Sequence, residues 1–248
     1  MRALVILPTY NEAENVVQLS RDVLAQNPAL DVLVVDDASP DGTGDLVEGE
    51  AACQSDAQPG SRPRLQLLRR AGKLGLGSAY LAGFRHALDR GYELALTMDC
   101  DYSHHPRYLP SILEATGRAD LVIGSRYVDG GGVANWPLRR RLLSRFANFY
   151  TRMLLRVPVG DCTAGFRCYR REVLLAVDPF SIQASGYSFL EEMVWRVHHC
   201  GFRIEEVPIV FEDRRLGISK IDEREIYRAA GHVLRTAVRR PPSRSPIA

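Results

Sequence analysis

The chain has 248 residues and a mass of 27.7 kDa, which is enough for one large domain with a well-buried core. Hydrophobic residues make up 46% and charged residues 25%, and no apolar run approaches the roughly 20 residues of a membrane-spanning helix. The five cysteines form no CxxC pair, which argues against a disulfide framework and structural zinc. Because the apolar run after Met1 is too short for a secretory signal, we expect a cytoplasmic protein.

Predicted strands and helices alternate along the first half of the chain. The hydrophobic pattern predicts strand 3–7, helix 12–26, strand 32–35, a capped helix after Asp41, strand 65–68, helix 77–90, strand 94–98, helix 107–115 and strand 121–123. The polar segment 53–63 is predicted to be a surface loop. This alternation predicts an α/β fold with a largely parallel sheet that helices cover on both faces.

Carboxylates and turn-forming residues follow three of these strands, in segments 8–12, 36–43 and 99–101. Ligands of open α/β sheets bind beyond the carboxyl ends of the strands. Asp99 and Asp101 stand one residue apart at such an end, where they would repel each other unless a cation offsets their charge. Mg²⁺ or Mn²⁺ held by two carboxylates keeps open positions for diphosphate oxygens. The pattern therefore predicts a nucleoside-diphosphate sugar as the donor substrate.

Several of the neighbouring residues also have a purely structural interpretation. Asp41 and Gly42 are typical of a turn and a helix cap, and Tyr10 could stack on a base or belong to the core. Segment 69–77 lacks the order of a P-loop, so we expect it to shape the floor of a nucleotide site. His104 and His105 are expected to fix a turn rather than bind the metal ion.

Eight segments between residues 8 and 220 together resemble one family, the polyprenol (dolichol) phosphate mannose synthases, which are catalytic subunits of glycosyltransferase family 2 with a GT-A fold. The segments are PTYNE (8–12), VDDASPDGT (35–43), KLGLGSAYLAG (73–83), MDCDYSHHP (98–106), GSRY (124–127), DCTAGFRCY (161–169), GYSFLEE (186–192) and RRLGISK (214–220). The first two indicate only the broad glycosyltransferase group. GSRY, the segment 136–148 and the last motif are what favour a polyprenyl-phosphate acceptor.

The resemblance implies a metal-dependent transfer of mannose from GDP-mannose to a polyprenyl (dolichyl-type) monophosphate, with inversion. It implies a nucleotide-sugar site made of Pro8, Tyr10, Glu12, Val35, Asp37, Asp99, Cys100, Asp101, Ser103, Arg126, Arg214 and Lys220. Asp99, Asp101 and Ser103 would hold Mg²⁺ or Mn²⁺, and Asp101, Arg126 and Arg140 would be catalytic. Cys100 departs from the Ala or Ser of the family, and Ser103 stands where some relatives have Gln.

The same resemblance assigns the acceptor phosphate to Arg126 and Arg140. A phosphate monoester is already an anion at pH 7, so the attack needs no dedicated general base. We expect the two guanidinium groups to hold the phosphate as a charge-assisted clamp. Glu192 is expected to organise the acceptor side of the site.

Segment 138–156 is predicted to form an amphipathic helix. One face would carry Leu138, Leu142, Phe146, Phe149 and Met153, widened by Leu143, Tyr150 and Leu154 and bordered by Arg141, Arg145, Arg152 and Arg156. Such a face suits an anionic membrane surface, although the pattern alone is equally typical of a core helix. The resemblance to enzymes of lipid phosphates favours the membrane. We therefore expect peripheral attachment to the cytoplasmic face of a membrane, with a separate membrane subunit as a possible anchor.

One GT-A domain is predicted over residues 1–239, followed by a disordered basic tail over 240–248. The alternatives are a UDP-glucose-dependent polyprenyl-phosphate glucosyltransferase, a family 2 enzyme with a hydroxyl acceptor, and a nucleotide-binding regulatory subunit without turnover. No nucleic-acid partner is expected, since the basic second half contains no known binding motif and the strand-end segments are acidic.

Overall fold

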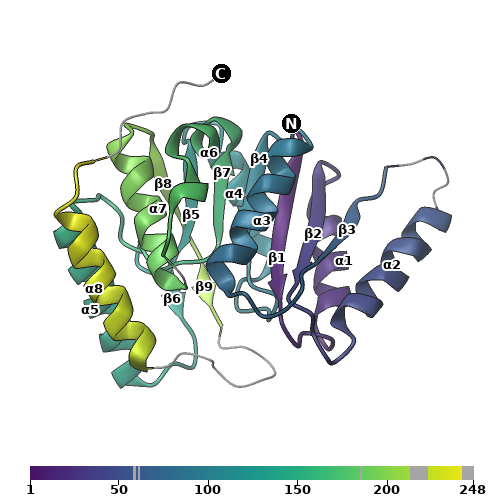
Figure 1. Ribbon diagram of the computed structural model, residues 1–248, viewed down its shortest axis with the longest axis horizontal. Helices are drawn as coiled ribbons and strands as arrows, with labels where there is room; N and C mark the ends of the chain where they lie inside the picture. The colour runs from purple at the N-terminus through teal and green to yellow at the C-terminus, as the bar shows by residue number, and fades with distance from the viewer. Residues whose placement is uncertain (58–59, 61, 185, 213–222, 242–248) are drawn as a thin grey trace.

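A sheet of seven strands organises the computed structural model, which describes residues 1–57, 60, 62–184, 186–212 and 223–241 (Figure 1). In spatial order the strands are β3 (Leu65–Arg69), β2 (Leu30–Asp36), β1 (Ala3–Thr9), β4 (Leu94–Thr97), β7 (Arg167–Arg170), β5 (Leu121–Ser125) and β8 (Ile204–Pro208). Neighbouring strands are parallel except at β7, which runs antiparallel to both β4 and β5. The predicted α/β fold with a mostly parallel sheet is confirmed.

Helices cover both faces of this sheet, because alternate residues of its central strands point to opposite sides. Leu4 and Ile6 of β1 belong to one core cluster, and Val5 and Leu7 to the other. The first cluster packs against α3 (Leu76–Asp89), α6 (Arg171–Val177) and α7 (Tyr187–His199). The second packs against α1 (Val16–Gln26), α2 (Thr43–Ala57) and α4 (Leu109–Ala115). Both clusters are closed to water, so the sheet is a rigid base for the loops at its edges.

The prediction for segment 53–63 is wrong in its first half, since α2 continues to Ala57. Residues 51–54 of α2 include two alanines and Gln54, which are good helix formers, and the Gln54 side chain donates a hydrogen bond to Glu50 one turn earlier. The breakers that suggested a loop, Pro59 and Pro63, come after the helix end. The predicted tail lies mostly outside the described residues, which end at 241.

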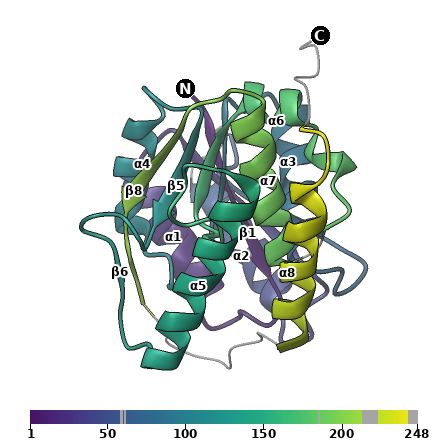
Figure 2. The same cartoon turned by 90° about the vertical axis from the view of Figure 1, so that its left-hand side faces the viewer.

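Two long helices, α5 (Leu138–Leu155) and α8 (Glu223–Ala237), pack together beside the β5–β8 end of the sheet (Figures 1 and 2). The Tyr150 hydroxyl of α5 donates to the Ala230 carbonyl of α8. The α5 apolar face is turned to solvent, with exposed fractions of 57–71% for Leu138, Leu142, Phe146, Phe149 and Met153. Tyr150 and Leu154 instead pack on the core. Among the described helices, none has the length and apolarity needed to cross a membrane.

The inner side of α5 is fixed by polar contacts with the core. Thr151 donates to Glu191 of α7 at 3.0 Å, and the other carboxylate oxygen of Glu191 has no hydrogen-bond partner among the described residues. Burial raises the pKa of Glu191 to about 7, although the hydrogen bond from Thr151 lowers it. Glu191 therefore carries a proton that the unfolded chain releases near its ordinary pKa of 4.5.

This difference predicts a pH-dependent stability that depends on Glu191. A carboxyl with a raised pKa in the folded state contributes fully below pH 4.5, and the contribution is lost as pH rises through about 7. Urea unfolding of the wild type and of Glu191→Gln at pH 5 and pH 8 measures this change in the free energy of unfolding. We expect the wild type to lose roughly 2 kcal/mol relative to the variant between the two pH values. An equal difference at both pH values would contradict this.

Candidate active site

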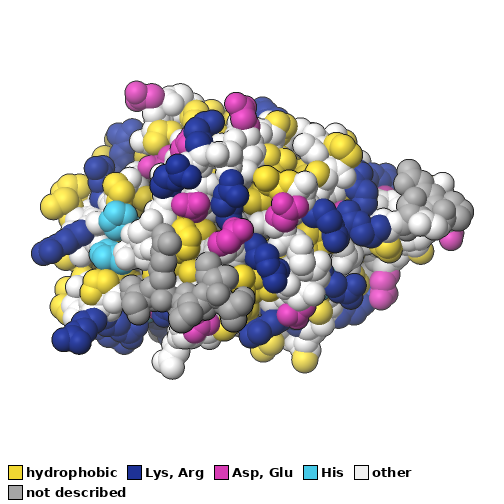
Figure 3. All heavy atoms as spheres, turned by 90° about the horizontal axis from the view of Figure 1, so that it is seen from above, with side chains coloured by type: hydrophobic (Ala, Val, Ile, Leu, Met, Phe, Trp, Pro, Cys, Tyr) yellow, Lys and Arg dark blue, Asp and Glu magenta, His cyan; other side chains and the backbone are white. Residues whose placement is uncertain are grey.

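The carboxyl ends of β2, β1 and β4 are neighbours in the sheet, and their loops meet at the lower edge in Figure 1. The first two loops are tied together. Asp36 accepts from the Thr9 hydroxyl at 2.9 Å and from Ser39, and Asp41 accepts from the backbone N–H of Ala13 at 3.0 Å. The opposite edge, seen in Figure 3, intersperses acidic and basic side chains. The predicted gathering of strand-end residues at one edge is thus confirmed.

Asp37 anchors the segment after β3. Its carboxylate forms an ion pair with Arg70 and accepts from the backbone N–H of Leu74 at 3.1 Å. The anchored segment places the Lys73 ammonium 4.5 Å from the centre of the half-buried Tyr10 ring. Asp37 therefore shapes this part of the edge by holding the loop, and a role of segment 69–77 as the floor of a nucleotide site stays a prediction.

Three carboxylates surround Cys100 after β4. Burial raises the pKa of the Cys100 thiol well above its usual range, and the charges of Glu12, Asp101 and Asp99 raise it further. We call Glu12, Asp99 and Asp101 the carboxylate cluster. The Asp99 side chain is 37% exposed, whereas Asp101 is buried. Like charges that lie close together destabilise one another, and a bound cation offsets this repulsion.

Asp101 and Ser103 present oxygen atoms, which are the ligands that a hard divalent ion prefers. Ser103 donates to Asp101 Oδ1 through its hydroxyl at 2.5 Å and its backbone N–H at 3.0 Å, which fixes the carboxylate. Across the described residues, no group of three or more His, Cys, Asp and Glu side chains is placed to hold a metal ion. Asp99 and Asp101 thus offer a partial ligand set, which suits an ion that shares its coordination with substrate oxygens and water.

The two histidines have structural partners, as predicted. His105 Nδ1 accepts from the Arg107 N–H and so caps the short 3-10 helix η1 (Pro106–Tyr108). His104 is 2% exposed and accepts from the Asp99 N–H at 3.2 Å. Its ring stacks on Phe166 with centroids 5.2 Å apart. His104 therefore supports the turn that presents Asp99.

Aromatic rings connect the carboxylate cluster to the predicted acceptor arginines. His104 lies edge-on to Phe211, at 5.4 Å, and Phe211 lies edge-on to Trp136, also at 5.4 Å. Phe211 belongs to β9 (Val210–Phe211), which pairs with β6 (Gly132–Val133). The guanidinium groups of Arg126 and Arg140 lie 5.6 and 4.0 Å from the Trp136 ring. The two predicted acceptor residues are therefore brought to one indole.

Trp136 itself has an unused donor. Its side chain is 8% exposed, and its Nε1 hydrogen has no acceptor among the described residues. A buried N–H without a partner is costly, so a ligand oxygen between the two guanidinium groups would satisfy it. Trp136 begins the segment 136–148 that favoured a polyprenyl-phosphate acceptor, but its contact with Phe211 was not predicted, because only the folded chain brings the two rings together.

Arg126 belongs to a buried ion pair rather than a surface one. Its guanidinium binds Asp161 bidentately at 2.7 and 2.6 Å, and its backbone N–H donates to the same carboxylate at 3.0 Å. The side chains are 9% and 0% exposed. Burial raises the pKa of Asp161, but the charge and hydrogen bonds of Arg126 outweigh burial and lower it. Asp161, unassigned from the sequence, fixes Arg126 in place.

The other predicted site residues differ in their burial and in whether the structure describes them. Pro8 and Glu12 are half-buried at the same edge, and the Glu12 carboxylate accepts from Asn15. The Val35 side chain is fully buried in the core, so only its backbone is placed for a ligand contact. Arg214 and Lys220 lie outside the described residues.

Glu192 lies away from the acceptor arginines. It accepts from Arg196 at 2.7 Å and from His232 of α8 at 2.7 Å, so it joins α7 to α8. Glu191, its neighbour, is the residue that contacts α5.

Comparisons with known proteins agree with this architecture. Residues 4–177 match the family Glycosyl transferase family 2. A polyprenol monophosphomannose synthase of Mycolicibacterium smegmatis is 46% identical, covering 96% of this chain and 88% of that protein. An undecaprenyl-phosphate mannosyltransferase of Micrococcus luteus is also 46% identical, covering 95% and 93%.

A solved structure shares the fold at low sequence identity. Glucosyl-3-phosphoglycerate synthase from Mycobacterium tuberculosis, in complex with Mn²⁺, UDP and glucosyl-3-phosphoglycerate, superposes with a TM-score of 0.66 at 18% identity, over 95% of this chain and 80% of that one. This likeness confirms the predicted GT-A type of fold. The family match spans β1 to α6, and two relatives are 46% identical over almost the whole length of the chain. The chain therefore belongs to glycosyl transferase family 2.

Proposed function

We propose that this protein transfers mannose from GDP-mannose to a polyprenyl monophosphate with inversion, giving polyprenyl phosphate β-mannose. The observation that carries the proposal is the 46% identity, over nearly the full length, to two proteins named for mannose transfer to polyprenyl phosphates. The site is compatible with it, since contacts between aromatic rings connect the turn that presents Asp99 to the two predicted acceptor arginines.

Asp99 and Asp101 would hold Mg²⁺ or Mn²⁺ together with the donor diphosphate, with Ser103 fixing Asp101. When bound, such an ion neutralises the charge that develops on the departing nucleoside diphosphate. Glucosyl-3-phosphoglycerate synthase from Mycobacterium tuberculosis, a protein of the same fold, has been crystallised with Mn²⁺ and UDP. The half-buried Tyr10 and the Asp37-anchored loop would border the nucleoside.

Arg126 and Arg140 would bind and orient the acceptor phosphate. Guanidinium groups form bidentate, charge-assisted hydrogen bonds with phosphate. Asp161 holds Arg126, and the Trp136 ring supports Arg140 at 4.0 Å. A phosphate oxygen then attacks the anomeric carbon as the bond from that carbon to the diphosphate oxygen breaks on the opposite side. The acceptor is already ionised, so no side chain needs to remove a proton.

We also propose that the protein attaches peripherally to the cytoplasmic face of a membrane through the α5 apolar face. Five large apolar side chains exposed on one helix, with arginines along its border, suit an anionic bilayer surface better than water. A separate membrane subunit could strengthen this attachment. All five cysteines are unpaired, which agrees with the reducing cytoplasmic side.

The role of Asp101 is tested by Asp101→Asn. The amide can still accept from Ser103, so the fold should persist, but one anionic ligand is lost. We expect Mg²⁺ to strengthen GDP binding to the wild type but not to the variant, and transfer to fall by at least about 100-fold. Titration calorimetry and a radiolabel transfer assay measure this, with the exposed Asp89→Asn as the control. Wild-type behaviour of Asp101→Asn would remove the metal assignment.

The acceptor role of Arg140 is tested by Arg140→Ala beside Arg139→Ala. Arg139 is an exposed neighbour on α5 with the same charge. We expect Arg140→Ala alone to raise the KM for polyprenyl phosphate by about 10-fold or more, because one charge-assisted contact is lost. GDP affinity should be unchanged in both. Weaker GDP binding with an unchanged acceptor KM would assign Arg140 to the donor instead.

Membrane attachment is tested by Phe146→Ser combined with Met153→Ser. The two side chains are 64% and 61% exposed, so their loss should leave the fold intact. We expect binding to vesicles of phosphatidylcholine and phosphatidylglycerol to fall by at least about 10-fold, since each buried side chain contributes about 2 kcal/mol. Leu46→Ser, an exposed apolar site on α2, is the control. Equal binding of all three proteins would refute attachment through α5.

A further inference from the structure

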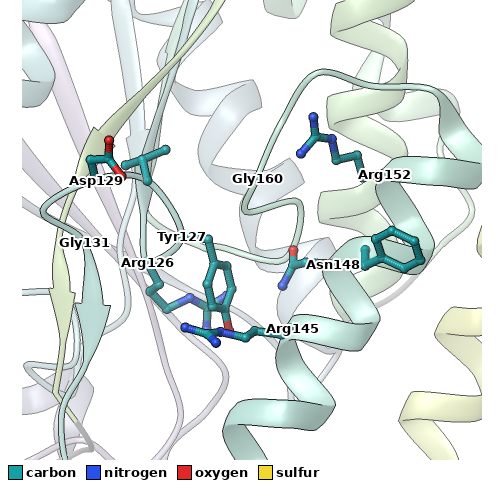
Figure 4. Close-up of a pocket in the computed structure, with 10 residues that line it drawn as sticks. Arg126, Tyr127, Asp129, Gly131, Arg145, Asn148, Arg152 and Gly160 are labelled. Atoms are coloured by element: carbon teal, nitrogen blue, oxygen red, sulfur yellow. The ribbon is translucent and has the colours of Figure 1, made fainter.

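A pocket of about 380 Å³ lies between α5 and the loop after β5 (Figure 4). In that view Arg145 reaches from α5 toward Arg126 and Tyr127, and Arg152 points toward the loop at Gly160. The residues that matter for its chemistry are Arg126, Asp129, Arg145, Phe149 and Arg152. We call this the arginine pocket.

The charge balance of the arginine pocket is positive. Arg126 is already neutralised by Asp161. Arg145 and Arg152 stand two helical turns apart on α5, are both exposed, and have no ion-pair partner within the described part of the chain. Asp129 is the one lining residue with a carboxylate, and it is exposed. Two uncompensated guanidinium groups that line one pocket give it a positive charge that suits a phosphate.

The arginine pocket is continuous with the α5 apolar face. Phe149 lines the pocket and is 61% exposed, on the same face as Phe146 and Met153. A ligand that fills the pocket and covers Phe149 must therefore combine an anionic group with hydrocarbon. Lipids with a phosphate head group have this composition.

The pocket shares one residue with the acceptor clamp. Arg126 belongs to the clamp and also lines the pocket, whereas Arg140 and Trp136 do not line it, so the two places adjoin at Arg126. A lipid phosphate in the arginine pocket would thus be a second phosphate beside the acceptor. We propose that the arginine pocket binds the head-group phosphate of an anionic membrane phospholipid and so fixes how α5 lies on the bilayer. This inference rests on the proposed attachment to a membrane.

The test compares two double variants of α5 with equal loss of charge, in the full-length protein. Arg145→Gln with Arg152→Gln removes both uncompensated pocket charges, whereas Arg139→Gln with Arg141→Gln removes two charges outside the pocket. On phosphatidylcholine vesicles containing phosphatidylglycerol, the control should lose up to about 30-fold in affinity from surface charge alone. We expect the pocket variant to lose at least about 10-fold more. Thermal melts confirm that both remain folded.

A second arm identifies the source of the phosphate. Vesicles of phosphatidylcholine with polyprenyl phosphate replace phosphatidylglycerol at equal surface charge. If the pocket variant loses more affinity than the control variant on phosphatidylglycerol vesicles, the proposal is supported, whatever the polyprenyl phosphate vesicles show. An excess loss only with polyprenyl phosphate would assign the pocket to the acceptor and overturn the proposal. Equal losses of both variants in both arms would show surface attraction alone and also overturn it.

The result of the vesicle-binding experiment does not depend on the transfer reaction. Wild-type transfer to polyprenyl phosphate in detergent micelles tests the proposed reaction without any phospholipid. If the wild type transfers mannose there and the two double variants bind vesicles equally, only the pocket inference fails. If no transfer occurs with any polyprenyl phosphate, the proposed function fails whatever the vesicles show.

Discussion

The delivery of three strand ends to one edge of the sheet is the constraint on which the rest of the site depends. β1, β2 and β4 are parallel neighbours, so the residues that follow them are delivered to the same place. Glu12, Asp99 and Asp101 act together on the buried Cys100. The protein satisfies other carboxylates of this edge internally, with Arg70 on Asp37 and Ser39 on Asp36. Asp99 keeps a partly exposed carboxylate, which is where a cation and a diphosphate would complete the charge balance.

On the acceptor side the charged groups are arginines, which supply the positive charge that a phosphate needs. Arg126 is fixed by a buried bidentate pair with Asp161, so its position costs little to maintain once the chain has folded. Phe211 and Trp136 separate this arginine from His104 and the carboxylate cluster. α5 is tied to the same region, because Asn148 donates to Thr163, which also accepts from Arg126. The helix with the exposed apolar face is thus connected to the residues that would hold a lipid phosphate.

Local patterns predicted the parallel strands, the strand-end carboxylates and the α5 apolar face, because each depends on residues close in sequence. Antiparallel β7 was not predicted, since its place between β4 and β5 is a long-range pairing. Segment 53–57 was misjudged because two later prolines outweighed the helix-forming Ala51, Ala52 and Gln54 of α2. Asp161, His104 and Trp136 acquire their roles through contacts with residues distant in the chain. Glu191 and Glu192 are adjacent, yet one faces α5 and the other α8, which only helix packing decides.

The most direct measurement is a crystal structure of the protein grown with GDP and Mn²⁺, with the ion located by its anomalous scattering. We expect one strong peak within coordination distance of carboxylate oxygens of Asp99 or Asp101 and of the GDP diphosphate, with the nucleoside beside Tyr10. A nucleotide bound at another edge of the sheet, or a manganese peak that both aspartates point away from, would contradict it.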